Sequence, residues 1–142
     1  MIQAARQQVA QLTQQAYEKA AEQGLLPAGA QVKATIEIPK DTAHGDYASS
    51  FAMAGAKALH MAPRAIAQAI VDHMDLTGSY FQKVDIAGPG FLNFILGPKW
   101  YGQVLAQVEQ EGPEYGSGSE GKGARVMVEF VSANPTGPMH MG

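Results

Sequence analysis

Two short apolar runs joined by a Pro-Gly pair constrain this chain more than any other feature of its sequence. The runs read FQKVDIAG at 81–88 and FLNFILG at 91–97, with Pro89 and Gly90 between them. Proline at the second and glycine at the third turn position is the pattern of a type II turn. The two runs are therefore predicted to pair as an antiparallel hairpin.

The second run divides by face, because successive side chains of a strand point to opposite sides of the sheet. One set is uniformly apolar and is predicted to point into the core: Leu92, Phe94 and Leu96. The other set is predicted to lie on the face of the sheet that the helices leave open: Phe91, Asn93 and Ile95.

Helical and strand periodicities surround this hairpin. Apolar residues at three- and four-residue spacing predict an amphipathic helix over the first 20 residues: Ile2, Ala5, Val9, Leu12, Ala16 and Ala20. Strict alternation over 32–38 predicts a strand with one buried face. The segment PKDTAHGDYASS is rich in turn residues, and either Asp46 or Ser49 is expected to cap a helix of small residues that follows it. A further helix is predicted to open at Pro63.

A last helix is predicted to carry Trp100, Val104, Leu105 and Val108. The predicted fold class is α+β. Residues 1–111 are expected to form a two-layer α-β-β-α-β-β domain, with an antiparallel sheet and helices on one face.

Composition excludes several kinds of site. The 142 residues contain no cysteine, so disulfides, thiolate metal ligands and cysteine nucleophiles are ruled out. The formal net charge of −3 provides no general attraction to nucleic acid, so any contact with a polyanion must be local. No apolar run approaches the about 18 residues that cross a membrane, and a cytoplasmic protein is expected.

The amino-acid composition changes after residue 111. Residues 112–123 read GPEYGSGSEGKG, a composition typical of a flexible linker. RVMVEFVS at 125–132 is apolar almost throughout, which is typical of a strand covered on both faces in a parallel sheet. Because such a strand cannot cover its own faces, residues 124–142 are predicted to open a second, incomplete domain of Rossmann-like type.

The most specific motif in the chain is VEFVSANPTGPMHMG at 128–142. Glu129 lies within an apolar strand pattern, where an unpaired carboxylate costs several kcal/mol. A carboxylate in such a place suits a cationic ligand. Ser132 and Asn134 follow at the carboxyl end of the predicted strand, where open α/β sheets place their ligands.

This run resembles the first strand and the HIGH-type motif of class I aminoacyl-tRNA synthetases, in the form found in arginyl-tRNA synthetases. HGDYASSFAM at 44–53 and DIAGPGFLNFIL at 85–96 are similar to two segments of the N-terminal domain of the bacterial arginyl enzymes. The three segments occur in the same order as in that family, and together they span nearly the whole chain.

The resemblance implies an ATP-dependent ligase that joins arginine to tRNA(Arg) through an arginyl-adenylate. It implies arginine contacts by Glu129, Ser132 and Asn134, and a catalytic role for His140 on the ATP triphosphate. ATP, accompanied by Mg²⁺, would be bound by Pro138, His140 and Gly142. The matching HIGH region comprises Ala133, Asn134, Pro135, Thr136, Gly137, Pro138, Met139, His140, Met141 and Gly142.

No tightly bound cofactor and no metal site are expected. The protein is expected to be a monomer, and this portion of it is expected to be inactive alone. The resemblance also implies that Phe91 and Asn93 contact a D-loop nucleotide of the tRNA, because an aromatic ring and an amide can stack on and pair with an unstacked base. The alternative is that Phe91 packs beside the turn while Asn93 is solvated.

Other interpretations of the chain stay open at this point. His44 with Asp46 and Tyr47 resembles an acid–base cluster, but a turn with a capping aspartate explains these residues better. His60 and His73 have no spacing typical of metal ligands. For the chain as a whole, the competing functions are another HxGH nucleotidyltransferase and a stand-alone RNA-binding module.

Overall fold

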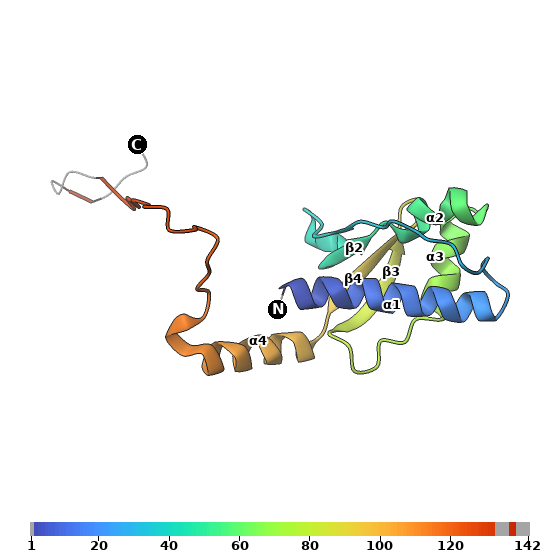
Figure 1. The fold of residues 1–142 in the computed structure, drawn as a ribbon, viewed down its shortest axis with the longest axis horizontal. Helices are drawn as coiled ribbons and strands as arrows, with labels where there is room; N and C mark the ends of the chain where they lie inside the picture. The colour runs from blue at the N-terminus through green and yellow to red at the C-terminus, as the bar shows by residue number, and fades with distance from the viewer. Residues whose placement is uncertain (1, 133–136, 139–142) are drawn as a thin grey trace.

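A computed structural model of the chain describes residues 2–132, 137 and 138. Its helices and strands follow one another as α1 (Ile2–Glu22), β1 (Ile36–Glu37), η1 (Thr42–His44), β2 (Tyr47–Ser49), α2 (Phe51–Leu59), α3 (Pro63–Asp72), β3 (Phe81–Ala87), β4 (Phe91–Leu96), α4 (Pro98–Glu111) and η2 (Gly112–Glu114). The fold is α+β, as predicted. The predicted α-β-β-α-β-β order is present, with α2 and α3 sharing the central helical position and α4 following the last strand (Figure 1).

Within the described residues, the strands form one antiparallel sheet of four strands in the order β1-β2-β4-β3. β3 and β4 are the predicted hairpin, with Ala87 opposite Phe91 beside the turn. The other side of β4 pairs with β2, so that Ala48 lies opposite Asn93. β4 is therefore one of the two inner strands of the sheet, and it joins the hairpin to β2.

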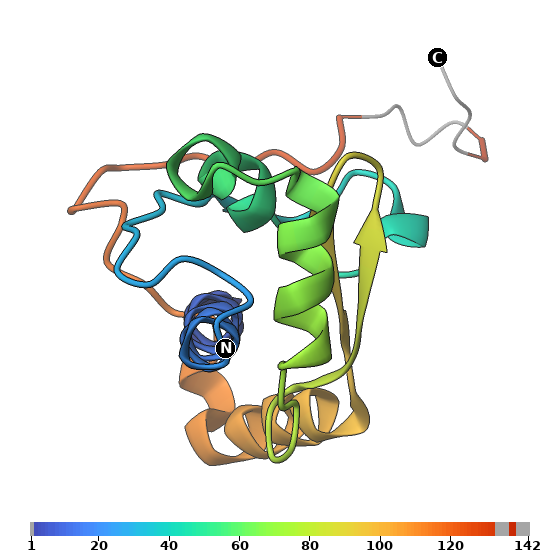
Figure 2. The same ribbon diagram turned by 90° about the vertical axis from the view of Figure 1, so that its right-hand side faces the viewer.

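The core lies between the sheet and the helices α1, α2 and α3, which cover one of its faces (Figure 2). The predicted core set of β4 is confirmed, because Leu92 and Phe94 are completely buried and Leu96 is 7% exposed. Helical partners of this set include Val9, Leu59, Ile66 and Ile70. Full burial of one such side chain contributes about 1.5–3 kcal/mol relative to exposure, so this layer holds the helices on the sheet.

The turn of the hairpin differs from the predicted type II turn. A hydrogen bond from Gly90 N to Ala87 O closes it, which makes Gly88 its second and Pro89 its third residue. Gly88 has a positive φ of 51°. Positive φ at the first central residue is a feature of type II′ turns, whose twist matches that of a hairpin, whereas a type II turn would splay the strands.

The strand predicted over 32–38 is shorter than its alternation indicates. Only Ile36 and Glu37 pair with β2, although alternate residues from Val32 to Ile36 are partly buried as predicted. The physical reason is the length of the partner, since a ladder extends no further than the shorter strand. Thr35 continues the contact through its backbone, which accepts from Ser50 N at 3.0 Å.

The segment that was predicted to consist of turns contains a strand, β2, which the sequence did not predict. Tyr47, Ala48 and Ser49 are all buried, and β4 supplies the backbone partners. The helix α2 therefore begins after Ser50, whose side chain makes no capping bond to it. Of the two predicted capping residues, Ser49 contacts the start of the helix, because its Oγ accepts from Phe51 N at 3.4 Å. Asp46 does not cap α2, because its Oδ2 accepts a hydrogen bond from Leu96 N at 2.8 Å.

The strand predicted at 125–132 is absent from the described residues. Residues 124–132 carry no helix or strand and are exposed, including Phe130 at 95%. A strand that is buried on both faces needs neighbouring strands for its hydrogen bonds, and the described residues supply none to it. The residues predicted as a linker, 112–123, are exposed and contain the short η2. The boundaries of the predicted domains remain predictions.

Candidate functional site

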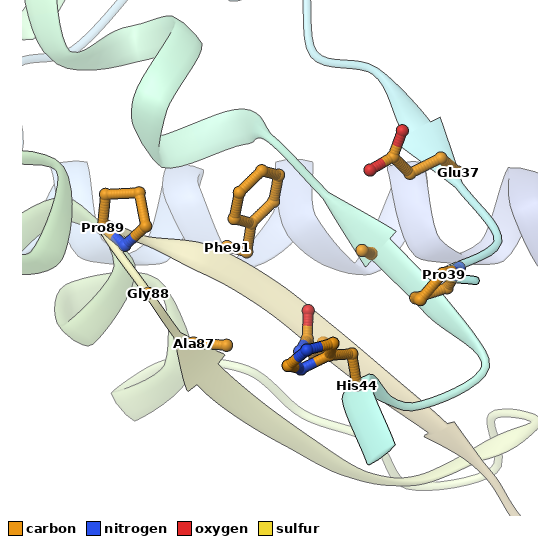
Figure 3. A pocket seen from close by; sticks show the side chains of 9 residues that line it. Glu37, Pro39, His44, Ala87, Gly88, Pro89 and Phe91 are labelled. Carbon is orange, nitrogen blue, oxygen red and sulfur yellow. The ribbon is translucent and has the colours of Figure 1, made fainter. Parts of the chain in front are cut away.

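A pocket of about 290 Å³ opens on the face of the sheet opposite the helices (Figure 3). Its lining comes from all four strands of the sheet, the segment after β1, the β3–β4 turn and η1: Glu37, Pro39, His44, Ala48, Ala87, Gly88, Pro89, Phe91 and Asn93. Most of the lining is apolar, with a few polar groups that converge on it. Such a composition is typical of a site that buries part of a small or flat ligand.

The floor of the pocket is one row of residues across the sheet. Glu37 lies opposite Ala48 on β2, and Ala48 lies opposite Asn93 on β4. The methyl group of Ala48 fills little space, so the floor is low between two longer side chains. Asn93 is 7% exposed and is therefore almost enclosed at this floor.

Phe91 and the β3–β4 turn form one side of the pocket, and Pro39 with His44 lies toward the other side (Figure 3). Phe91 is half-buried, so part of its ring is available for a ligand. A residue outside the pocket holds the turn in place, since Arg64 Nη1 donates to Gly88 O at 2.7 Å. Gly90 lies so close to α3 that a Cβ there would approach the carbonyl carbon of Pro63 to 3.1 Å.

Local interactions of the segment HGD place His44 at the pocket. Asp41 caps η1, because its Oδ1 accepts from Ala43 N at 2.9 Å. Gly45 has a φ of 81°, and a Cβ at this residue would come within 2.8 Å of Phe94 O. Asp46 N then donates to that same Phe94 oxygen at 2.9 Å. These contacts join the loop to β4 and direct η1 over the open face of the sheet.

The charge around the pocket is acidic. Glu37 is the charged residue of the lining, and Asp85 lies opposite Asn93 one strand further along the same row. Asp85 forms an ion pair with Lys83 at 2.6 Å, with both side chains about half exposed. The pocket therefore does not favour a phosphate, since the carboxylate of its lining repels an anion.

The structure confirms that Phe91 and Asn93 share the open face and brings them into one pocket. The alternative of a solvated Asn93 does not describe this structure, because the residue is almost buried. The sequence reading missed Glu37, Pro39 and His44 as lining residues. Glu37 belongs to the polar half of the alternation at 32–38, but only the register with Ala48 shows that it reaches this pocket.

The Arginyl tRNA synthetase N terminal domain family matches residues 4–96. The chain belongs to the arginyl-tRNA synthetase family. Every residue that lines the pocket falls inside the matched range. Membership in this family also separates the chain from other HxGH nucleotidyltransferases.

Relatives of the chain support the same family. It is 42% identical to an arginine–tRNA ligase of Acetivibrio thermocellus over all 142 residues, which cover 25% of that protein. It is 51% identical to an arginine–tRNA ligase of Desulforamulus reducens over 107 residues, or 75% of this chain and 19% of that protein. The chain thus spans about a quarter of the length of the curated relatives it matches.

A solved structure shows the same fold. The arginyl-tRNA synthetase of Plasmodium falciparum aligns with 72% of this chain and 18% of its own, with a TM-score of 0.57 and 15% identity. At this identity the likeness concerns the arrangement of helices and strands alone.

The residues that the arginyl-tRNA synthetase motif singled out lie apart from the pocket in sequence. Glu129 and Ser132 are exposed in the segment without helix or strand, so Glu129 is not the buried carboxylate that was predicted. Gly137 and Pro138 are also exposed. Ala133, Asn134, Pro135, Thr136, Met139, His140, Met141 and Gly142 lie outside the described residues. Their predicted roles remain predictions.

Within residues 2–132, 137 and 138, no three acidic, histidine or cysteine side chains gather closely enough to hold a metal ion. No helix in this part of the chain has the length and apolar character needed to cross a membrane.

Proposed function

We propose that this chain is the tRNA-contacting N-terminal part of an arginine–tRNA ligase, and that its pocket holds one unstacked base of the D-loop of tRNA(Arg). The pocket carries the proposal: it combines a half-buried aromatic ring, Phe91, with an almost enclosed amide, Asn93, on one open face. Single-stranded RNA loops are commonly recognised by stacking on such a ring and by hydrogen bonds to a base edge.

The acidic charge of the chain agrees with a local mode of recognition. With a net charge of −3, the chain has no surplus of cationic side chains for general electrostatic binding of the phosphate backbone. Insertion of one base into an apolar pocket does not need such a surplus. We expect the isolated chain to bind tRNA weakly and to add affinity when linked to further tRNA-binding surfaces of the whole enzyme.

The activity of the whole protein is part of the proposal. Curated relatives, of which this chain covers about a quarter, are arginine–tRNA ligases. We propose that the complete protein uses ATP with Mg²⁺ to form an arginyl-adenylate and then esterifies tRNA(Arg), in the cytoplasm and as a monomer. This chain would be inactive alone.

We propose that residues 124–142 begin the Rossmann-like catalytic domain, after a linker at 112–123. Within it, Glu129, Ser132 and Asn134 would hold arginine. His140, with Pro138 and Gly142, would contact ATP. The carboxylate of Glu129 suits a cationic amino acid, and the imidazole of His140 suits a triphosphate.

The test of the pocket is arginylation by the complete enzyme with Phe91→Ala and Asn93→Ala. Loss of one base-stacking contact costs about 1–3 kcal/mol, so we expect kcat/KM for tRNA to fall about 5- to 150-fold with Phe91→Ala. The KM values for arginine and ATP should stay unchanged. Gln11→Ala, an exposed amide of α1, is the matched control for Asn93→Ala. Unchanged tRNA kinetics in both pocket variants would overturn the proposal.

A further inference from the structure

We infer that Glu37 selects the base in this pocket by accepting a hydrogen bond from an exocyclic amino group of the nucleobase. The inference rests on the proposed function of the pocket and adds a residue that determines which base is accepted. Glu37 would contact the edge of the base, whereas Phe91 would stack on its face.

The position of Glu37 follows from the register of the sheet. Glu37, Ala48 and Asn93 form a continuous row over β1, β2 and β4. Adjacent strands are about 4.8 Å apart, so the outer two backbones are separated by about 10 Å with only a methyl group between them. A flat ring laid over Ala48 would therefore present one edge to Glu37 and another edge to Asn93.

The side chain of Glu37 is directed at this space. Figure 3 shows its carboxylate turned from β1 toward Phe91, over the interior of the pocket. In the described part of the chain the ion pair of this face is Lys83–Asp85, which leaves Glu37 without a cation. The neighbours of Glu37 in the pocket lining include Pro39 and Ala48, whose side chains have no hydrogen-bond donor.

The chemistry of a carboxylate then decides between bases. A carboxylate accepts hydrogen bonds and donates none, so it is satisfied by an amino group and repelled by a carbonyl oxygen. Adenine and cytosine carry an amino group on the pairing edge, and uracil carries a carbonyl at the same place. Asn93 can donate and accept, so it can satisfy the second edge of either kind of base. The selectivity therefore comes from Glu37.

Phe91 and Glu37 are tested by separate measurements on the complete enzyme. The contacted nucleotide is first located by placing an abasic residue at each D-loop position of a tRNA(Arg) made by ligation. At one position, the abasic change should lower kcat/KM for the wild-type enzyme and have little effect on Phe91→Ala. Absence of any such position would overturn the proposed function itself.

At that position, adenosine is then compared with purine riboside, which lacks only the amino group. Removal of one hydrogen bond to a charged group should lower kcat/KM about 10- to 150-fold for the wild-type enzyme. The same change should have less than about a twofold effect on Glu37→Ala, because the partner of the amino group is already gone. Glu37→Gln should also accept uridine, since its carboxamide can donate to a carbonyl oxygen.

Glu22→Gln, at an exposed position at the end of α1, is the matched control and should retain the wild-type preference. An equal loss from the missing amino group in wild type and in Glu37→Ala would overturn the role of Glu37. A wild-type preference for uridine would overturn it as well. In both cases, the position found with Phe91→Ala would still support base insertion into the pocket.

Discussion

Arg64 on α3 donates a hydrogen bond of 2.7 Å from its Nη1 to the carbonyl oxygen of Gly88 in the β3–β4 turn. The bond links the start of a helix that packs on the core face to a turn that lines the pocket on the open face. A residue outside the pocket thereby contributes to its shape, because the turn leads directly into Phe91.

Replacement of Arg64 by Met keeps much of the aliphatic stem and removes the guanidinium. Because Arg64 is exposed, we expect a loss of stability below about 1 kcal/mol. The freed turn should hold Phe91 less well and raise KM for tRNA about 3- to 10-fold in the complete enzyme, an energy similar to that of one hydrogen bond. Lys57→Met in α2 is the control for loss of a positive charge, and an equal effect of both variants would show that charge alone matters.

Substitution by alanine should destabilise the chain more at Gly90 than at Gly88. Gly90 has a φ of 143°, and a Cβ would lie within 3.0–3.1 Å of Pro63, so Gly90→Ala combines backbone strain with a clash against α3. We expect it to destabilise this chain by about 2–4 kcal/mol. Gly88→Ala places its Cβ in open space at a φ of 51°, so a cost of about 1 kcal/mol is expected. Urea unfolding of the two variants measures the difference, and equal costs would contradict the close approach.

Asp46 should stabilise the fold through the acceptor that it offers to Leu96 N at 2.8 Å. Asp46→Ala leaves this amide without its partner and should lower the free energy of unfolding by about 1–3 kcal/mol. Asp46→Asn keeps an oxygen acceptor and should cost less than half as much. If instead the two variants unfold at the same urea concentration, the carboxylate rather than its hydrogen bond is what matters.

Tyr47 should make the stability of the chain fall at high pH. Burial raises the pKa of the Tyr47 phenol above its ordinary value of 10.0; Arg6 offsets part of this rise, and Asp46 adds to it. The unfolded chain therefore loses this proton at a lower pH than the folded chain does. The stabilisation is complete below about pH 10 and is lost as the pH rises through the higher pKa of the folded state.

The free energy of unfolding, measured by urea at pH values from 8 to 11.5, should fall more steeply above about pH 10 in the wild type than in Tyr47→Phe. Tyr115→Phe changes a residue that is 42% exposed and should behave like the wild type. Identical pH profiles for all three proteins would mean that the buried phenol is not linked to stability.

Much of the fold follows from local patterns of the sequence. The alternation in FLNFIL assigned Leu92, Phe94 and Leu96 to the core, and all three are buried there. The three- and four-residue spacing at the N-terminus predicted a helix, and α1 covers Ile2–Glu22. These predictions succeed because one buried face imposes its own period on a segment, whatever its partner is.

The rest of the fold was decided by which segments of the chain pair with one another as strands. HGDYASS has the composition of a turn, yet Tyr47–Ser49 is a strand because β4 supplies its hydrogen bonds. Conversely, RVMVEFVS has the composition of a buried strand, yet the described residues 124–132 form none without neighbours. A backbone segment becomes a strand only where another strand satisfies its polar groups. The composition of the segment does not show whether such a partner strand is present.

The candidate site divides in the same way. By itself, the sequence determined that Phe91 and Asn93 share the outward face of one strand, because alternation within a strand is a local property. Only the tertiary structure brought Glu37, His44 and the β3–β4 turn around them, because register across β1, β2 and β4 depends on how separate segments align. Periodicity is encoded residue by residue, whereas a pocket exists only after distant segments have packed together.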